Sequence, residues 1–131
     1  HLEWIFQENK VPHQRGARTE SRSKPDFLFP GSEKYQDPNW PDERLTMLGV
    51  KTTCKDRWRQ VLNEARRIPE KHLLTLQPGI SEHQTSEMKL ASLTLVLPRG
   101  LHDTYSAAQK EHLLDVSEFI TLVRERQAGH Q

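Results

Sequence analysis

The sequence predicts a single α/β domain with a central mixed sheet flanked by helices, and three observations support this prediction. The chain has 131 residues, which is enough for one hydrophobic core but not for two. Short apolar runs bounded by proline or glycine alternate with segments whose apolar residues recur at helical spacing. Hydrophobic residues make up 34% and charged residues 28% of the chain, as is typical of a folded domain rather than a disordered one.

The N-terminal part is expected to hold one helix and two strands. Apolar residues within 2–6 indicate a short helix that ends before Pro12, since proline disfavours helix at the residue before it. An exposed strand is predicted over residues 14–19. A short buried strand is predicted over 27–29, where three apolar residues are followed by a Pro-Gly pair. Asp26 therefore stands at the start of a strand.

The middle of the chain indicates a central strand followed by a helix. Residues 45–53 are mostly Leu, Met, Val and Thr, a run short enough for a strand that is covered on both faces. Lys51 is expected to project from the end of that strand. From residue 55 the apolar residues recur at helical spacing as far as Ile68, and Pro69 ends the predicted helix.

Two more strands and two helices are predicted in the second half. The strands cover residues 72–76 and 93–97, and a helix includes residues 86–90. An apolar stripe over 113–123 indicates a closing helix. This stripe belongs either to the core or to a dimer contact, and we expect it in the core.

Composition excludes several kinds of protein. No apolar stretch approaches the roughly 18 residues needed to span a bilayer, and the N-terminus lacks the pattern of a signal peptide, so we expect a cytoplasmic protein without membrane contacts. Cys54 is the only cysteine, which excludes an internal disulfide and a four-thiolate zinc site. Residues 1–67 hold thirteen Lys or Arg against ten Asp or Glu. By itself this excess is weak evidence for nucleic-acid binding.

Asp26, Lys51 and Glu64 form the strongest candidate catalytic site. Hydrolysis of a phosphodiester needs a divalent metal held by carboxylates, an activated water, and positive charge against the transition state. Asp26 and Glu64 are the candidate ligands of Mg²⁺, which prefers oxygen, together with the backbone carbonyl of Val50. Each charge alone is more often a solvated surface group. Lys51 differs because it ends an apolar strand, where an unpaired ammonium is costly to desolvate.

The strand that carries the lysine resembles part of the PD-(D/E)XK arrangement of nucleases. In that arrangement the strand reads acid-x-Lys, so that the acid and the lysine share one face. Here the strand reads Gly49-Val50-Lys51. Alternation places residue 49 on the face of Lys51, and glycine leaves room there for a side chain from elsewhere. Glu64, on the following helix, is expected to fill that space.

Lys55, Asp56 and Arg57 begin the predicted helix. A donor, an acceptor and a donor within one turn can read base edges, because Lys or Arg donates to guanine and a carboxylate accepts from the cytosine amino group. From the residues alone, a helix-capping Asp between two solvated cations is the better interpretation.

Tyr35, nine residues after Asp26 in a predicted loop, is a further catalytic candidate. Its hydroxyl would contact the phosphate; the alternative is that it packs and bonds to the backbone. None of the seven His forms a pair at metal-ligand spacing with a supporting Cys, which argues against zinc. No nucleophile-elbow glycine pattern supports covalent hydrolysis.

Four segments resemble the catalytic domain of EcoRII-type restriction endonucleases. They are Lys-Pro-Asp-Phe-Leu-Phe-Pro-Gly at 24–31, Val-Lys-Thr-Thr-Cys-Lys-Asp-Arg-Trp-Arg-Gln-Val-Leu-Asn-Glu-Ala at 50–65, Lys-His-Leu-Leu-Thr-Leu-Gln at 71–77 and Ile-Ser-Glu-His-Gln at 80–84. The resemblance covers nearly the whole chain, and the long central motif is specific. It implies a restriction-endonuclease-like fold. It also implies that residues 1–131 are one domain, the C-terminal part of a cleavage domain, without the family's N-terminal effector domain.

The resemblance also implies roles for these residues. Asp26, Lys51 and Glu64 would form the active site in a permuted form, in which a helix supplies the second acid. The triplet 55–57 would read the outer C·G pairs of the site, which makes the capping interpretation the lesser one. The implied activity is Mg²⁺-dependent cleavage of double-stranded DNA at CCWGG or CCNGG sites, 5′ to the first cytosine. A homodimer is implied as well, since a symmetric site fits a two-fold dimer.

Two other functions fit the same residues. A DNA-binding or dimerisation module would keep the fold without cutting, and metal dependence separates it from an enzyme. A repair-type nuclease would use the same carboxylates but ignore the flanking sequence, so substrate specificity separates it from a restriction enzyme.

Overall fold

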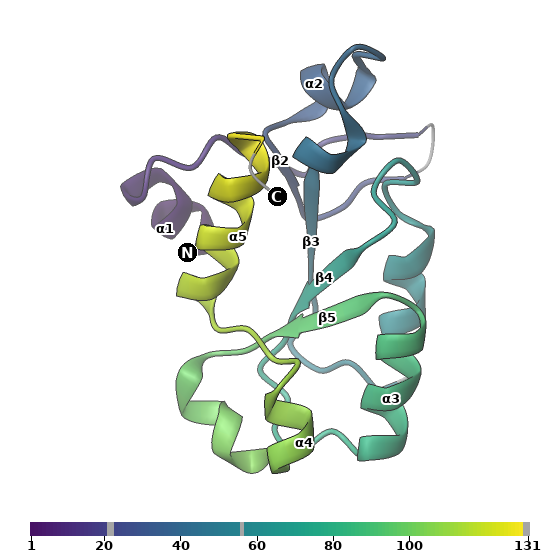
Figure 1. Cartoon of the computed structure of the whole chain (residues 1–131), viewed down its shortest axis with the longest axis vertical. Helices are drawn as coiled ribbons and strands as arrows, with labels where there is room; N and C mark the ends of the chain where they lie inside the picture. Colours follow the sequence, from purple (N-terminus) through teal and green to yellow (C-terminus); the bar gives the residue numbers. More distant parts are fainter. Residues whose placement is uncertain (21–22, 56, 130–131) are drawn as a thin grey trace.

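The computed structural model describes residues 1–20, 23–55 and 57–129 (Figure 1). Within these residues a mixed sheet of five strands runs in the order β1-β2-β3-β4-β5. The strands are β1 (Gln14–Arg15), β2 (Phe27–Phe29), β3 (Thr46–Val50), β4 (Lys71–Leu74) and β5 (Leu93–Val96). The pairs β1·β2 and β2·β3 are antiparallel, whereas β3·β4 and β4·β5 are parallel. The central strand β3 therefore joins the antiparallel half of the sheet to the parallel half.

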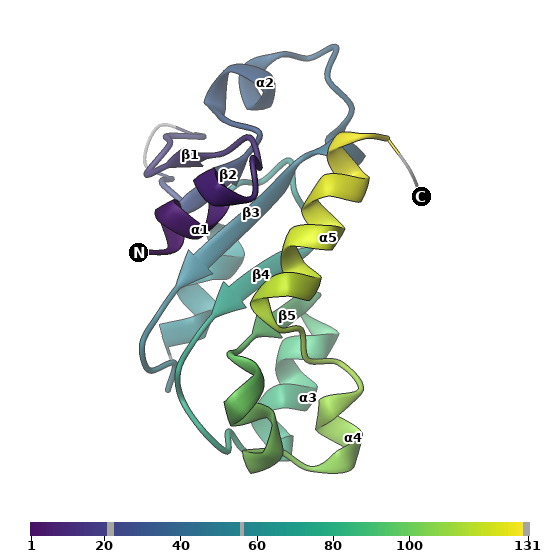
Figure 2. The same cartoon turned by 90° about the vertical axis from the view of Figure 1, so that its left-hand side faces the viewer.

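Helices cover both faces of this sheet. The α-helices are α1 (Leu2–Glu8), α2 (Ser32–Gln36), α3 (Glu82–Leu90), α4 (Ala107–Lys110) and α5 (Val116–Gln127), and the 3₁₀ helices are η1 (Asp42–Arg44), η2 (Arg57–Asn63) and η3 (Arg99–Thr104). Helices α1 and α5 lie on one face and α3 on the other, as the view in Figure 2 shows with α1 and α5 in front. The predicted α/β architecture, a mixed sheet flanked by helices, is confirmed. Among the described residues, no helix has both the length and the apolar character needed to cross a bilayer.

The alternation of side chains along β3 divides the interior into two clusters. Met47 points to the cluster that contains Trp58 and Val61 of η2, whereas Leu48 points to the cluster that contains Phe119 of α5. All of these side chains are buried. The closing apolar stripe, with its buried residues Phe119, Ile120 and Val123, belongs to the core as expected.

The two longer C-terminal helices begin at side-chain caps. Asp115 accepts a hydrogen bond from the main-chain N–H of Glu118, and the Glu118 carboxylate accepts one from the N–H of Asp115. Ser81 caps α3 by accepting from the N–H of Gln84. These bonds satisfy N–H groups that have no partner within the helix.

The region after β3 departs from the prediction. A helix was expected from residue 55 to Ile68, but the chain forms the 3₁₀ helix η2 and then a turn over residues 64–68. Ala65 adopts a φ of +48°, which interrupts helical hydrogen bonding. The apolar positions still face the core, because Val61 and Ile68 are both 1% exposed. Helical spacing thus identified the buried face correctly but not the type of helix.

Two shorter differences lie nearer the N-terminus. The strand predicted over 14–19 is limited to β1, since Gly16 follows it with a φ of +63°. The segment around Tyr35, expected as a loop, contains the short helix α2, and the 3₁₀ helix η1 follows it.

Candidate active site

Asp26 is hydrogen-bonded to the end of β3. It precedes β2, whose residue Phe27 pairs with Leu48 of the antiparallel strand β3. Asp26 Oδ2 accepts a hydrogen bond from the main-chain N–H of Val50 at 2.7 Å. Lys51 follows immediately, half-buried, and its N–H donates to the carbonyl of Leu74 at 3.0 Å. The sheet therefore places the carboxylate of Asp26 and the base of the Lys51 side chain at one position, where β3 ends.

Glu64 is the first residue of the turn that follows η2. It is half-buried, and its pKa is raised to about 7, first by burial and then by the negative charge of Asp26. The ammonium groups of Lys51 and Lys71 act in the opposite direction on this pKa. Since the interaction of two charges weakens with distance, these effects place Asp26 and Lys51 near Glu64. The structure thus places Asp26 beside the end of β3 that leads into Lys51, with Glu64 within electrostatic range of both residues.

One carboxylate oxygen of Glu64 has surroundings that suit a metal ligand. Oε1 is buried and has no hydrogen-bond partner in the described part of the chain. A buried, unpartnered carboxylate oxygen is uncommon in proteins and calls for an explanation such as an ion. The described residues contain no group of three or more His, Cys, Asp and Glu that could hold a metal. Mg²⁺ needs no such group, because it is usually bound through one or two carboxylates, waters and substrate phosphates.

The space beside Gly49 is filled by Val61 and Leu73, and not by Glu64 as expected. A Cβ on Gly49 would lie 3.1 Å from Val61 Cγ2 and 3.4 Å from Leu73 Cδ1. Val61 occupies this position because η2 packs on the sheet through its apolar side, where a charged side chain would be costly to bury. The prediction that Glu64 fills the space at Gly49 is wrong. Glu64 lies three residues further along the chain, where it keeps partial contact with solvent.

The segment expected to bind DNA follows β3 directly. Lys55 and Arg57 are exposed, whereas Asp56 lies outside the described residues. Gln77 Oε1 accepts hydrogen bonds from the main-chain N–H groups of Cys54 and Lys55 at 2.7 and 3.3 Å. Arg57 Nη2 donates to the carbonyl of Thr53 at 3.0 Å. The backbone of this segment is therefore held next to the end of β4, and its basic side chains face solvent.

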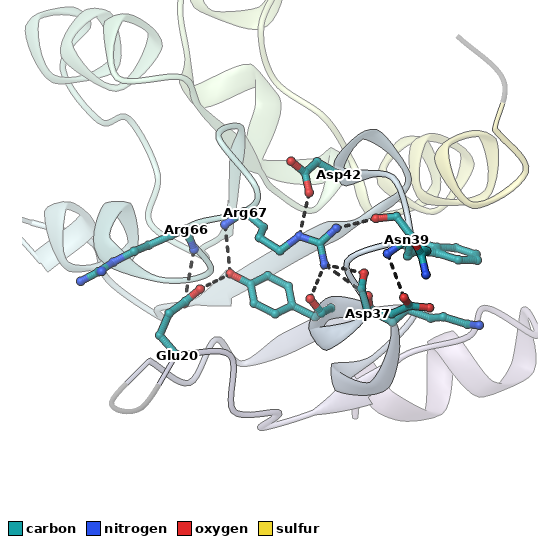
Figure 3. Close-up of polar contacts among 9 residues, drawn as sticks. Glu20, Asp37, Asn39, Asp42, Arg66 and Arg67 are labelled. Carbon is teal, nitrogen blue, oxygen red and sulfur yellow. Dashed lines mark hydrogen bonds and ion pairs between the residues drawn. The ribbon is translucent and has the colours of Figure 1, made fainter.

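Tyr35 takes part in a different network. It lies in α2 and is 3% exposed. Its hydroxyl donates to the Glu20 carboxylate and accepts from the main-chain N–H of Arg67 at 3.0 Å (Figure 3). Burial raises the pKa of Tyr35 to about 12. These contacts favour the packing alternative for Tyr35 over a contact with the phosphate.

Lys71 was not predicted from the sequence as a residue of the site. Its side chain is 4% exposed, and its ammonium donates to the main-chain carbonyls of Glu64, Ala65 and Ile68. The sequence did carry a signal for burial of this lysine, because Lys71 directly precedes His72, Leu73 and Leu74, which form β4 with it. The predicted strand began one residue later and left this lysine outside.

Comparisons with known proteins show the family of the chain. Residues 1–120 match the family model described as EcoRII C terminal. The type II restriction enzyme EcoRII of Escherichia coli is 49% identical over 121 residues, which are 92% of this chain and 30% of that protein.

Solved structures of Ecl18kI have the same fold. Metal-depleted Ecl18kI in complex with uncleaved, modified DNA gives a TM-score of 0.81 at 21% identity, and its complex with uncleaved DNA gives 0.80 at 20%. Each match covers 98% of this chain and 43% of the Ecl18kI chain. The chain thus spans less than half the length of these relatives. The family model covers nearly all of the sequence and the identity to EcoRII is high, so the resemblance is confirmed and the chain belongs to the EcoRII C-terminal family.

Proposed function

We propose that this chain is the cutting part of a type II restriction endonuclease, which hydrolyses phosphodiester bonds in double-stranded DNA with the help of Mg²⁺. The observation that carries the proposal is the hydrogen bond that joins Asp26 to the end of β3 beside Lys51, together with the half-buried Glu64, whose Oε1 is buried and unpartnered among the described residues. Membership of the EcoRII C-terminal family supports it.

Asp26 and Glu64 would hold the metal, and the Val50 carbonyl would add a third oxygen. In an extended strand the N–H and C=O of one residue point to the same side. The N–H of Val50 points to Asp26, so its carbonyl is directed to that side too. When bound, Mg²⁺ polarises the phosphate and lowers the pKa of a water molecule.

Lys51 would contribute positive charge to the reaction. Lys51 follows Val50, whose N–H is bonded to Asp26, and its charge lowers the pKa of Glu64, which supports a place at the edge of the proposed metal site. From there it would orient the attacking water and stabilise negative charge on the phosphate in the transition state.

Lys55 and Arg57, with Asp56 between them, would read the DNA sequence. Both basic side chains are exposed, and the main-chain N–H groups of Cys54 and Lys55 donate to Gln77, which holds the backbone of Lys55. By the family resemblance the target is CCWGG or the broader CCNGG, cut 5′ to the first cytosine. The symmetry of such a site supports a homodimer as the acting form.

Plasmid cleavage tests this proposal. The chain would be incubated with a plasmid that carries CCWGG and CCSGG sites, in Mg²⁺ or in EDTA, beside its Lys51→Ala form. Lys89→Ala, which removes an exposed lysine from α3, is the matched control. We expect Mg²⁺-dependent bands that map to CCWGG, lost in Lys51→Ala but kept in the control, with DNA binding equal in all three.

Other outcomes would identify a different function. Binding without cutting at any Mg²⁺ concentration would support a non-cutting module of the same fold. Mg²⁺-dependent cutting without sequence preference would support a repair-type nuclease. An equal loss of binding and cutting in Lys51→Ala would contradict the role of Lys51 in the reaction.

A further inference from the structure

The turn over residues 64–68, which carries the second proposed metal ligand, is bonded through its N–H groups to side chains from elsewhere. The three consecutive main-chain N–H groups of 65–67 donate in turn to Ser23 Oγ, Glu20 Oε1 and the Tyr35 hydroxyl, at 3.0, 3.4 and 3.0 Å. In a continuous helix these N–H groups would bond to carbonyls of the preceding turn. Side chains replace those partners here.

Lys71 holds the carbonyl side of the same turn. Its ammonium donates to the carbonyl of Glu64, to that of Ala65 at 2.9 Å and to that of Ile68 at 2.6 Å. An ammonium has three N–H donors, and all three are used within this one turn. Lys71 is 4% exposed, so water competes little for these bonds.

The turn needs such support because its backbone is unfavourable. Ala65 has a φ of +48°, a left-handed conformation that residues with a side chain adopt only when their surroundings impose it. Lys71 holds the carbonyls of the turn, and the side chains of Ser23, Glu20 and Tyr35 hold its N–H groups. Together these bonds impose the left-handed conformation of Ala65.

A second link joins the turn to α2. The Tyr35 hydroxyl also donates to the Glu20 carboxylate, so two of the three acceptors are bonded to each other (Figure 3). The guanidinium of Arg67, the last residue of the series, donates to the carboxylate of Asp42 and to the carbonyl of Trp40. The turn is thus attached to a neighbouring part of the fold.

The carboxylate of Glu64 depends on this support. Its Oε1 has no hydrogen bond in the described part of the chain, so no such bond fixes that oxygen directly. The place of the carboxylate therefore depends on the backbone to which the side chain is attached and on the packing around it. A shift of that backbone would move the carboxylate relative to Asp26, which the sheet holds through the N–H of Val50.

We propose that Lys71 and Tyr35 are positioning residues that hold the backbone of Glu64 so that its carboxylate meets Asp26 around a divalent cation. The inference rests on the proposed function, because it concerns the same metal site. In this proposal neither residue touches the cation or the DNA, because the polar groups of both side chains are bonded to protein atoms. Groups that orient metal ligands in this way typically change metal affinity about 10–100-fold when they are removed.

Metal binding without DNA tests this inference. The probe is Mn²⁺, titrated into the chain and followed by the electron paramagnetic resonance signal of the free ion. Lys71→Met keeps the length of the side chain and removes its three donors, and Tyr35→Phe removes only the hydroxyl. We expect each to weaken Mn²⁺ binding by about tenfold or more, while affinity for cognate DNA in EDTA stays unchanged. Cleavage by Tyr35→Phe should recover at high Mn²⁺.

Tyr105→Phe is the matched control. Tyr105 is 5% exposed, and its hydroxyl donates to the carbonyl of Gln77 at 2.6 Å, away from the turn. It loses the same kind of buried hydrogen bond as Tyr35→Phe and should bind Mn²⁺ like the unmodified chain. Circular dichroism melts identify the variants that fold, and if Lys71→Met does not fold, Tyr35→Phe decides.

Asp26→Ala in the same titration separates the two proposals. Unchanged Mn²⁺ affinity in Asp26→Ala would overturn the metal site itself. Loss of Mn²⁺ binding in Asp26→Ala, with unmodified affinity in folded Tyr35→Phe and Lys71→Met, would overturn the positioning role alone. A contact between Tyr35 and phosphate predicts that second pattern, because no DNA is present.

Discussion

The side chain of Val61 lies against the backbone of Gly49, and a Cβ placed on Gly49 would come within 3.1 Å of Val61 Cγ2. Gly49→Ala should therefore force η2 away from β3 and lower the free energy of unfolding by about 1–3 kcal/mol. Urea denaturation measures this loss. Gly100→Ala is the matched control, since a Cβ there meets nothing within 4 Å. Equal stability of the two variants would contradict close packing at Gly49.

Glu64 makes the stability of the metal-free protein depend on pH. Burial and the charge of Asp26 raise its pKa from 4.5 to about 7, so ionisation of Glu64 disfavours the folded state. This cost is absent below pH 4.5, develops between 4.5 and 7, and is complete above. Glu64→Gln should therefore be more stable than the unmodified chain at pH 8, by about 1 kcal/mol once solvent screening is allowed for.

Urea denaturation in EDTA at two pH values checks this expectation. The gain from Glu64→Gln should be present at pH 8 and nearly absent at the acid end of the range. A gain of equal size at both pH values would show that the ionisation of Glu64 is not its cause.

Arg57 should contribute to specific DNA binding. Arg57→Ala is expected to weaken binding to a cognate duplex by about 1–3 kcal/mol, with a smaller effect on a scrambled duplex, if its guanidinium contacts a base. Arg59→Ala is the control, because Arg59 is already paired with Glu87 at 3.2 Å and stacked on Trp58. Fluorescence anisotropy in EDTA measures both, and unchanged cognate affinity in Arg57→Ala would refute the contact.

Arg67 should stabilise the part of the chain around α2. Its guanidinium donates to the Asp42 carboxylate at 2.7 Å and to the main-chain carbonyls of Tyr35, Asp37 and Trp40. Lysine carries fewer donors and lacks the planar fork that reaches all of these acceptors. Arg67→Lys should therefore lower the free energy of unfolding by about 2 kcal/mol or more.

The control for this prediction is Arg66→Lys. The Arg66 side chain is exposed and points away from the network in Figure 3. This change should leave stability within about 0.5 kcal/mol of the unmodified chain. Unchanged stability in Arg67→Lys would mean that positive charge, rather than the geometry of the Arg67 guanidinium, stabilises the region.

The sequence was most informative where structure is decided locally. The apolar runs predicted the strands that hold Asp26 and Lys51, since burial and alternation are properties of neighbouring residues. The end of η2 could not be predicted in this way. It depends on Tyr35, which is distant in sequence from the turn, and on Lys71, which follows the turn but belongs to the strand β4. Glu64 was identified as an acid of the site, but the turn that presents it was not.

The functional assignments show the same limit. Tyr35 was considered for the phosphate because it follows Asp26 closely in sequence, yet the fold directs its hydroxyl to Glu20 and the backbone of Arg67. Lys71 was left outside the site because a buried lysine that bonds only to carbonyls has no motif of its own.

The two acids of the proposed metal site are attached to the fold in different ways. Asp26 is fixed by the sheet, whereas Glu64 follows residues 52–63 and relies on the hydrogen bonds that hold the turn over residues 64–68. The proposed base-reading residues 55–57 belong to the stretch before that turn. Remodelling of this segment toward a new target sequence would therefore have to keep the turn in place, which ties the evolution of specificity in this chain to the preservation of its chemistry.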